Sequence, residues 1–238
     1  MDIAARAAIV TGASRGLGRH VARALARAGM KVALAARDES RLLAVAEEIR
    51  AAGGEALAVP TDVTRWPQVE ALAATVGERF GAIDVLVNNA GVGCYKPFVE
   101  TSLAELDAQM DSSFRGTVYA TRAVLPGMLE RRRGHIVNIA SDLARKPLAK
   151  LAVYAGAKHA VLGFSQSLLR EVKASGVKVT TILPGIIDTD FGGGREGTRE
   201  ETWSLRPEFV AAKIVELLGW PEHWLADELT LHPLHQDF

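Results

Sequence analysis

The sequence predicts an α/β fold in which helices cover both faces of a parallel sheet. Two observations support this prediction: short apolar runs typical of buried strands recur along the chain, and amphipathic stretches separate them. Strands that alternate with helices return the chain to the same edge of the sheet, so neighbouring strands run parallel. The expected strands are residues 7–10, 32–35, 56–59, 85–87, 136–139 and 179–183, with a final strand within 226–233.

The length and composition are those of one globular unit. The chain has 238 residues, of which 48% are hydrophobic and 24% are charged. This balance can bury a core and argues against a disordered chain or a small disulfide-stapled protein. We expect a single domain over residues 1–238, and the lone cysteine, Cys94, excludes an intramolecular disulfide.

The charge balance argues against two classes of partner. Lys and Arg total 28, as do Asp and Glu, so no global field favours nucleic acid or an anionic membrane surface. No stretch without charged residues approaches the length of about 20 apolar residues that a membrane-spanning helix needs. We therefore expect no nucleic-acid partner, no membrane partner and a cytoplasmic location, which the lone cysteine also favours.

Helical patterns follow the strands. Leu17, Val21 and Leu25 recur every four residues after the first strand, and Gly29 follows as a stop signal, which predicts a helix over residues 16–28. Two longer patterns cover residues 114–129 and 153–172. We interpret both as crossover helices of the sheet.

A glycine-rich segment, residues 11–18, joins the first strand to its helix. Because the segment enters the helix directly, its backbone N–H groups can face an anion, and a diphosphate fits there. Gly12 can make the tight turn, Gly16 allows close backbone approach, and Gly18 lets the helix lie against the strand. A plain connecting turn is the alternative. The residues expected to bind the cofactor here are Gly12, Ser14, Arg15, Gly16, Leu17 and Gly18.

Two arginines bear on which cofactor is preferred. Arg37 ends the second strand, at a position where an acidic residue would favour a free ribose 2′-hydroxyl. A guanidinium can instead hold a 2′-phosphate through charge-assisted hydrogen bonds, and Arg15 can approach the same phosphate. We therefore expect NADP(H) to be preferred over NAD(H). The alternative is that both arginines are solvated surface charges.

Further motifs follow the glycine loop in a fixed order. In chain order, the motifs are residues 11–18, Asp62-Val63, Asn88-Asn89-Ala90-Gly91, Ser141, Tyr154 with Lys158, and Pro184-Gly185 followed by Thr189. In this combination they resemble those of the short-chain dehydrogenase/reductase family in its single-domain form. The resemblance implies a Rossmann-type doubly wound sheet of about seven strands. It also implies adenine contacts at Asp62 and Val63, and nicotinamide contacts at Pro184, Gly185, Ile187 and Thr189. Between them the cofactor would run beside Asn89, Ala90 and Gly91.

Three of these residues favour proton and hydride chemistry. Tyr154 and Lys158 stand four residues apart at the expected start of a helix, so one helix face can present both. A free tyrosine has a pKa of about 10, and a nearby cation is needed to make it a proton donor near neutral pH. Ser141 follows a strand, where its hydroxyl can hold a substrate oxygen. The resemblance implies that Tyr154 and Lys158 also contact the cofactor, Lys158 through the nicotinamide ribose.

The combination predicts that NADPH delivers hydride to a carbonyl carbon while Tyr154 protonates the oxygen, or that the reverse reaction oxidises an alcohol. Singly, Ser141 is explained equally well as a helix cap, Tyr154 as a half-buried aromatic residue and Lys158 as a solvated charge.

One position departs from the family pattern: Ser113 stands where the family commonly carries an asparagine that holds a water in a proton relay toward the lysine. Ser113 is either a modified catalytic relay residue or a helix-start residue.

The sequence specifies the substrate and the partners less closely than it specifies the cofactor. Residues 190–206 follow the nicotinamide motif, where the family places its variable substrate loop, and their glycines predict mobility. A basic segment with Arg145, Lys146 and Lys150 either attracts an anionic substrate or carries solvated charges. We expect a small-molecule carbonyl or alcohol substrate, and the resemblance implies a homodimer or homotetramer. A non-catalytic NADP(H)-sensing regulatory protein and an epimerase or dehydratase on the same fold are the alternatives.

Overall fold

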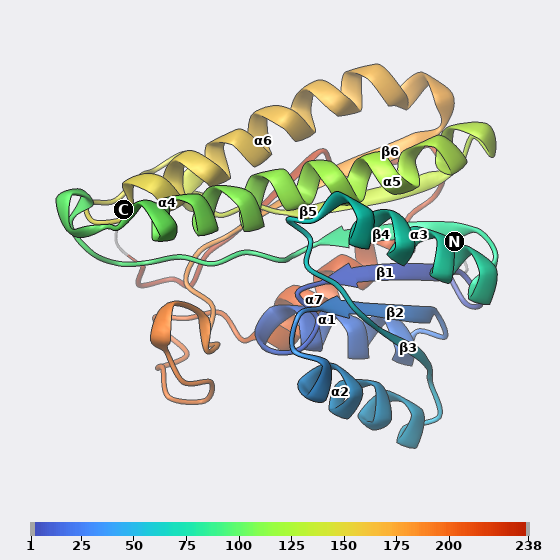
Figure 1. The fold of residues 1–238 in the computed structure, drawn as a ribbon, viewed down its shortest axis with the longest axis horizontal. Helices are drawn as coiled ribbons and strands as arrows, with labels where there is room; N and C mark the ends of the chain where they lie inside the picture. Colours follow the sequence, from blue (N-terminus) through green and yellow to red (C-terminus); the bar gives the residue numbers. More distant parts are fainter. Residues whose placement is uncertain (1–2, 237–238) are drawn as a thin grey trace.

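Seven parallel strands form one central sheet. The computed structural model describes residues 3–236, and its sheet has the strand order β3-β2-β1-β4-β5-β6-β7 (Figure 1). Every neighbouring pair of strands is parallel. The predicted fold class is confirmed, as is each predicted strand. The strands are β1 (Ala7–Thr11), β2 (Lys31–Ala36), β3 (Glu55–Pro60), β4 (Ile83–Asn88), β5 (Gly134–Ile139), β6 (Val177–Pro184) and β7 (Glu228–Leu231).

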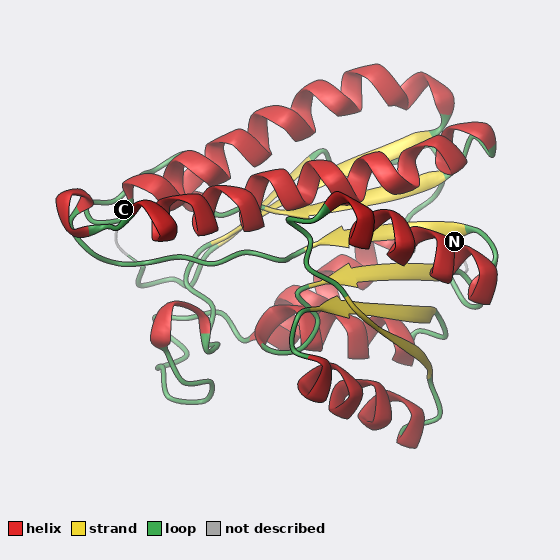
Figure 2. Ribbon diagram, in the orientation of Figure 1, coloured by secondary structure: helices red, strands yellow, loops and turns green. Residues whose placement is uncertain are grey.

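Helices cover both faces of the sheet, as Figures 1 and 2 show. Helices α1, α2 and α7 pack against one face, and α3, α5 and α6 pack against the other. None of the helices within residues 3–236 has both the length and the apolar character needed to cross a membrane. The helices are α1 (Gly16–Arg27), α2 (Glu39–Ala51), α3 (Trp66–Phe80), α4 (Leu103–Met110), α5 (Gly116–Glu130), α6 (Ala152–Val172) and α7 (Pro207–Leu218).

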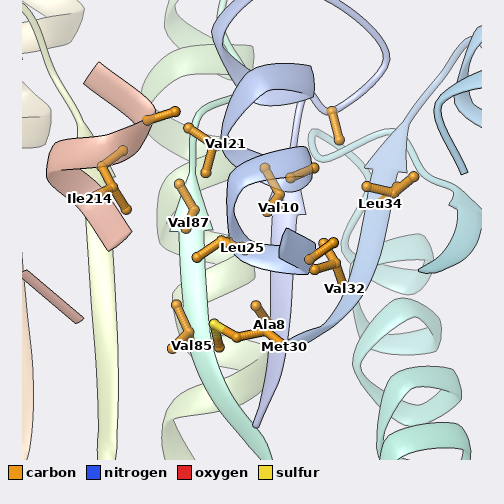
Figure 3. Close-up of a cluster of buried hydrophobic side chains, with 14 of the residues drawn as sticks. Ala8, Val10, Val21, Leu25, Met30, Val32, Leu34, Val85, Val87 and Ile214 are labelled. Atoms are coloured by element: carbon orange, nitrogen blue, oxygen red, sulfur yellow. The ribbon is translucent and has the colours of Figure 1, made fainter. Parts of the chain in front are cut away.

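Alternate residues of the strands contribute to two separate cores. In β1, Ala8 and Val10 join the core that contains α1 and α7, whereas Ile9 joins the core that contains α3 and α5. Figure 3 shows the first core, in which Val21 and Leu25 of α1 lie against the strand residues. Because both faces are covered, successive strand positions are apolar. This is why the strands could be recognised as continuous apolar runs.

A buried row of polar side chains ties the sheet to α5 and α6. Asn88 Nδ2 donates to Asn138 Oδ1 at 2.8 Å and to Thr121 Oγ1 at 3.1 Å. Asn138 Nδ2 in turn donates to Ser165 Oγ at 2.8 Å. All four side chains are buried, where an unpaired amide is costly. These bonds therefore fix α5 and α6 relative to β4 and β5.

The chain enters α5 differently from the sequence prediction. The predicted helix begins at residue 114, whereas α5 begins at Gly116 and is preceded by a π-helical segment, Asp111–Arg115, that continues from α4. The Ser113 carbonyl oxygen in this segment accepts a hydrogen bond from Thr117 Oγ1 at 2.8 Å. Such π-helical turns are rare and frequently occur at functional sites. Periodicity did not predict this segment, because a single wide turn interrupts the regular helical spacing.

Candidate active site

A cavity of about 950 Å³ opens at the carboxyl edge of the sheet. It lies where the strand order reverses between β1 and β4, which is the point where sheets of this type bind ligands. Among the predicted site residues, all but Gly18 and Ser113 line this cavity. The structure therefore brings together segments that are far apart in the sequence.

The loops that follow β1 and β4 are bonded to each other beside the cavity. Thr11 Oγ1 accepts hydrogen bonds from the Asn89 N–H at 3.0 Å and the Ala90 N–H at 3.1 Å. Gly12 has a φ of +66°, and a Cβ there would lie 2.9 Å from Ala90 Cα, so a side chain is excluded. A Cβ at Gly18 would collide with the Gly12 carbonyl oxygen. Gly18 therefore lets α1 approach the loop without lining the cavity itself.

The start of α1 faces the cavity and fits a diphosphate. Ser14, Arg15, Gly16 and Leu17 all line the cavity at this point. No side chain caps the helix, and its first turn contains no acidic residue. Its backbone N–H groups and its dipole are therefore available to an anion. The geometry of the glycine loop is compatible with the predicted anion site, and anion binding there stays a prediction.

Three arginines line the end of the cavity next to β2: Arg15, Arg37 and Arg41. Arg41, which was not predicted, lies in the first turn of α2, whereas Arg37 precedes the residue that caps this helix. Asp38 lines the same end, but its carboxylate caps α2 by accepting the Arg41 N–H at 3.1 Å. This bond and a second from Ser40 hold the pKa of Asp38 below its ordinary value. The carboxylate is therefore already engaged, whereas the arginines surround it with positive charge.

Asp62 and Val63 form the neighbouring wall, as predicted. Asp62 Oδ1 accepts hydrogen bonds from the Thr64 N–H at 3.0 Å and from the Thr64 hydroxyl at 2.8 Å. Val63 is buried against the start of α5 and lines the cavity. This wall therefore offers an apolar contact beside polar groups, which suits an aromatic base.

Ser141, Tyr154 and Lys158 meet at the other end of the cavity. Tyr154 and Lys158 lie in the first two turns of α6, and Lys158 Nζ is 5.6 Å from the centre of the Tyr154 ring. Lys158 Nζ donates to the Ile139 carbonyl oxygen at 2.7 Å, which joins α6 to the end of β5. Ser141 Oγ, just after β5, donates to Asp142 Oδ1 at 3.0 Å. The predicted trio of catalytic side chains is thus assembled around one point.

Burial acts on the two titratable groups in opposite directions. Burial raises the pKa of Tyr154, a hydrogen bond with Ser141 partly offsets this, and the negative charge of Asp142 raises the pKa further. Burial also lowers the pKa of Lys158 to about 8. The expectation that Lys158 makes the phenol acidic is therefore not met in the protein alone, where burial dominates. The phenol therefore keeps its proton at neutral pH in the protein alone.

Ser113 lies behind the cavity wall. Its Oγ is buried in the π-helical segment and has no hydrogen-bond partner among residues 3–236. A Cβ at Gly91 would lie 3.0 Å from Ser113 Oγ and 3.7 Å from Lys158 Nζ, so hydroxyl and ammonium both approach Gly91. An unsatisfied hydroxyl is therefore present close to the ammonium, at the position where the family commonly carries an asparagine.

The segment after β6 forms the wall nearest to Tyr154. Its predicted residues all line the cavity: Pro184, Gly185, Ile187 and Thr189. Four apolar side chains that were not predicted also line it, and each is substantially exposed: Tyr95 (64%), Leu148 (47%), Ile186 (41%) and Phe191 (41%). The Phe191 ring lies 5.4 Å from the Tyr154 ring, centre to centre. Apart from their nearness to the motifs, nothing in the sequence predicted that these four side chains would line the cavity.

The predicted substrate loop, residues 190–206, is fastened at its distal half. Asp188 is 1% exposed, and its Oδ2 accepts the Gly197 N–H at 2.9 Å and the Arg206 guanidinium at 3.2 Å. Glu196 also lies 2.8 Å from His20 Nε2 on α1. Phe191 and Gly192, in the proximal half, line the cavity. The mobility of this loop stays a prediction.

The fold and the site define a class of protein: an α/β protein in which a glycine loop and a tyrosine–lysine pair line one cavity at the carboxyl edge of a parallel sheet. The family model described as short chain dehydrogenase matches residues 6–199. The chain belongs to the short-chain dehydrogenase/reductase family, and is thus an oxidoreductase.

Similar proteins agree with this assignment. An uncharacterized oxidoreductase of Staphylococcus saprophyticus subsp. saprophyticus is 37% identical, over 98% of this chain and 100% of the relative. Among solved structures, an alcohol dehydrogenase from the archaeon Thermococcus sibiricus complexed with 5-hydroxy-NADP has a TM-score of 0.92 at 32% identity, covering 98% of each chain. An actinorhodin polyketide ketoreductase variant with NADPH has a TM-score of 0.88 at 33% identity, covering 96% of each chain.

The low pKa of Lys158 predicts how stability depends on pH. An unfolded lysine titrates near 10.5, so between about pH 8 and 10.5 the unfolded chain binds more protons at this residue than the folded protein does. The free energy of unfolding should therefore rise by about 3 kcal/mol because of this residue as the pH rises through that window. In Lys158→Met, the free energy of unfolding should no longer rise across this pH window. Lys173→Met replaces an exposed lysine and should show the same rise as the wild type. Urea unfolding of the cofactor-free protein at several pH values measures the difference, and identical pH dependence in wild type and Lys158→Met would contradict it.

Proposed function

We propose that the protein is an NADP(H)-dependent oxidoreductase that transfers a hydride between nicotinamide and a carbonyl or alcohol substrate, with Tyr154 as the general acid and base. The observation that carries this proposal is the convergence of Ser141, Tyr154 and Lys158 on the cavity that also contains the glycine loop. A sensor needs only the cradle for the cofactor. A proton donor placed at the far end of the same cavity is a requirement of catalysis.

The lining of the cavity fits the cofactor along its length. The start of α1 would bind the diphosphate, and the wall with Asp62 and Val63 would bind the adenine. Arg15, Arg37 and Arg41 supply cations for a 2′-phosphate, which supports a preference for NADP(H). Both carboxylate oxygens of Asp38 already have partners: Oδ1 caps α2, and Oδ2 lies 3.2 Å from Arg41 Nε. Asn89, Ala90 and Gly91 line the path toward Pro184, Gly185, Ile187 and Thr189, which would flank the nicotinamide.

Each catalytic side chain then has a distinct task. When bound, NADPH supplies the hydride that reaches the carbonyl carbon. Tyr154 donates its phenolic proton to the carbonyl oxygen, and the raised pKa keeps that proton on the phenol at neutral pH. Ser141 donates a hydrogen bond to the same oxygen and holds it within reach of Tyr154. Lys158 holds the nicotinamide ribose and stabilises the tyrosinate that proton transfer leaves behind.

The cavity walls favour a small carbonyl compound with an apolar substituent. Tyr95, Leu148, Ile186 and Phe191 stand exposed at the cavity near Tyr154, and a substrate would cover their apolar surface. Residues 190–206 contribute Phe191 and would serve as the substrate loop. Assembly into a homodimer or homotetramer through the long helices, residence in the cytoplasm and recruitment of anionic substrates by residues 145–150 stay predictions.

The proposed activity is tested by NADPH oxidation across aldehydes, ketones, quinones, sugars and 3-oxoacyl thioesters. Apolar ketones or aldehydes should be reduced, and Tyr154→Phe should lower kcat by at least about 100-fold, because general acid catalysis contributes on this scale. Tyr119→Phe, which removes a phenol from α5, is the matched control and should keep full turnover. Cofactor binding without turnover of any compound would favour a sensor, and redox-neutral products would favour an epimerase or dehydratase.

The cofactor preference is tested at Arg37. Arg37→Ser should lower kcat/KM for NADPH about 10- to 100-fold, the expected loss for charge-assisted hydrogen bonds to a phosphate, and should change the value for NADH by less than about threefold. Arg170→Ser removes an exposed arginine of α6 and should change neither value. A wild-type protein that uses NADH more efficiently than NADPH would contradict the assignment.

The role of Ser113 is tested by two substitutions. If Ser113 is a relay residue, Ser113→Ala should lower kcat about three- to tenfold, because the hydroxyl that orders a water near Lys158 is lost. Ser113→Asn should restore the family's amide and shift the pH profile of turnover. Both variants should bind NADPH as the wild type does in a fluorescence titration. Unchanged turnover and pH profile in both variants would leave Ser113 as a helix residue only.

A further inference from the structure

The tail that follows β7 returns to the active site. The His235 N–H donates to the Thr202 carbonyl oxygen at 3.2 Å, which places the tail along the substrate loop. One residue further on, the Gln236 side chain is 9% exposed and lines the cavity. A Cβ at Gly185 would collide with Gln236 Oε1, so the tail is in close contact with the segment after β6.

Gln236 bridges the two segments that flank the substrate oxygen. Its Nε2 donates to Asp142 Oδ2 at 2.5 Å, and its Oε1 accepts the Ile186 N–H at 2.8 Å. Asp142 directly follows Ser141 in the chain, and Ile186 lies within the segment expected to flank the nicotinamide, between Gly185 and Ile187. One amide therefore uses both its donor and its acceptor to fix the distance between the two walls.

Asp142 in turn bonds the catalytic hydroxyl. Its carboxylate is 5% exposed and accepts the Ser141 hydroxyl at 3.0 Å. The Ser141 oxygen itself accepts the Leu143 N–H at 3.2 Å. Ser141 has a single proton, so the Asp142 carboxylate and a substrate carbonyl oxygen compete for it. How strongly the carboxylate holds that proton depends on the donors that Asp142 receives from elsewhere.

We propose that Gln236 is a positioning residue, which orients Asp142 so that Ser141 can release its proton toward the substrate oxygen and which holds the wall at Ile186. This inference rests on the proposed function. Gln236 does not touch the reacting atoms; it acts through Asp142 and the Ile186 backbone. The tail is therefore part of the active site and not only a structural or assembly element.

The same contact bears on the proton of Tyr154. The negative charge of Asp142 disfavours the tyrosinate, and the amide dipole of Gln236 partly compensates that charge. Without Gln236 the carboxylate holds the Ser141 proton more firmly and disfavours the tyrosinate more strongly. His232 Nε2, in the tail, lies 3.5 Å from Asp142 Oδ2. The other charged groups that line this part of the cavity are Lys158 on α6, and Asp190 and Arg199 in the loop after β6.

The first experiment compares Gln236→Ala with Leu234→Ala, a control in the same tail whose side chain is 90% exposed. Gln236→Ala should lower kcat about tenfold, the scale of a hydrogen bond to a charged group, and should move the pH profile of alcohol oxidation upward. The Kd for NADP⁺ should stay within about twofold, because Gln236 acts at the substrate end. Leu234→Ala should match the wild type in all three measurements.

A second variant separates the two arms of the bridge. Gln236→Glu keeps an acceptor for the Ile186 N–H but replaces the donor to Asp142 with a carboxylate, so the upward shift of the pH profile should exceed that of Gln236→Ala. Asp142→Asn removes the charge, and Gln236→Ala in that background should no longer shift the profile. Equal kcat and equal pH profiles for wild type, Gln236→Ala and Gln236→Glu would overturn the proposal.

A third measurement needs no substrate. Hydrogen exchange of the Ile186 amide should be faster in Gln236→Ala and unchanged in Leu234→Ala, because only the former loses the acceptor of that N–H. If the Ile186 amide exchanges at the same rate in the wild type, Gln236→Ala and Leu234→Ala, then Gln236 does not hold this wall and the proposal fails. A wild-type protein that reduces no carbonyl compound would instead contradict the proposed function, while the exchange rates still decide whether Gln236 holds this wall.

Discussion

The reversal of strand order between β1 and β4 is the constraint on which the active site depends. Crossover connections from these neighbouring strands run to opposite sides, so no connection closes the carboxyl edge at this point. The glycine loop after β1 and the segment after β4 meet there through Thr11 and Asn89. The cavity extends from this junction toward β2 on one side and β6 on the other, so the arginines at one end and the Tyr154–Lys158 pair at the other line one continuous space.

Burial determines the chemistry at the far end of that space. A phenol and an ammonium in water would both be charged only within a narrow pH range, but here burial favours the neutral form of each. The ammonium is held by the Ile139 carbonyl oxygen, and the phenol packs against Phe191. The protein thus accepts a destabilising buried cation at the site where, in the proposed mechanism, it would stabilise a tyrosinate. Such strained pairs are typical of functional sites.

Much of this arrangement could be predicted from the sequence, because its signals are local. The strands are apolar on both faces, and the glycine loop and the Tyr154–Lys158 pair each lie within a few residues. What could not be predicted depends on long-range contacts or on burial: the bridge from Gln236 to Asp142 joins residues 94 positions apart. The π-helical turn around Ser113 and the direction of the Tyr154 pKa shift also follow only from packing. Arg41 also had no periodic signal, because Arg37 lies before the residue that caps α2 and the two arginines do not share a helix.

The buried carboxylate of Asp188 divides the loop after β6 into two parts with different tolerance to change. Backbone and side-chain bonds to Asp188 anchor the part from Gly197 to Arg206, whereas Phe191 and Gly192 project into the cavity without such bonds to Asp188. Diversity introduced by directed evolution at the proximal positions would reshape the pocket while the anchor keeps the loop attached. Substitutions at Gly197 or Arg206 would instead disturb the bonds to Asp188, so the anchor separates positions that shape the pocket from positions that hold the loop in place.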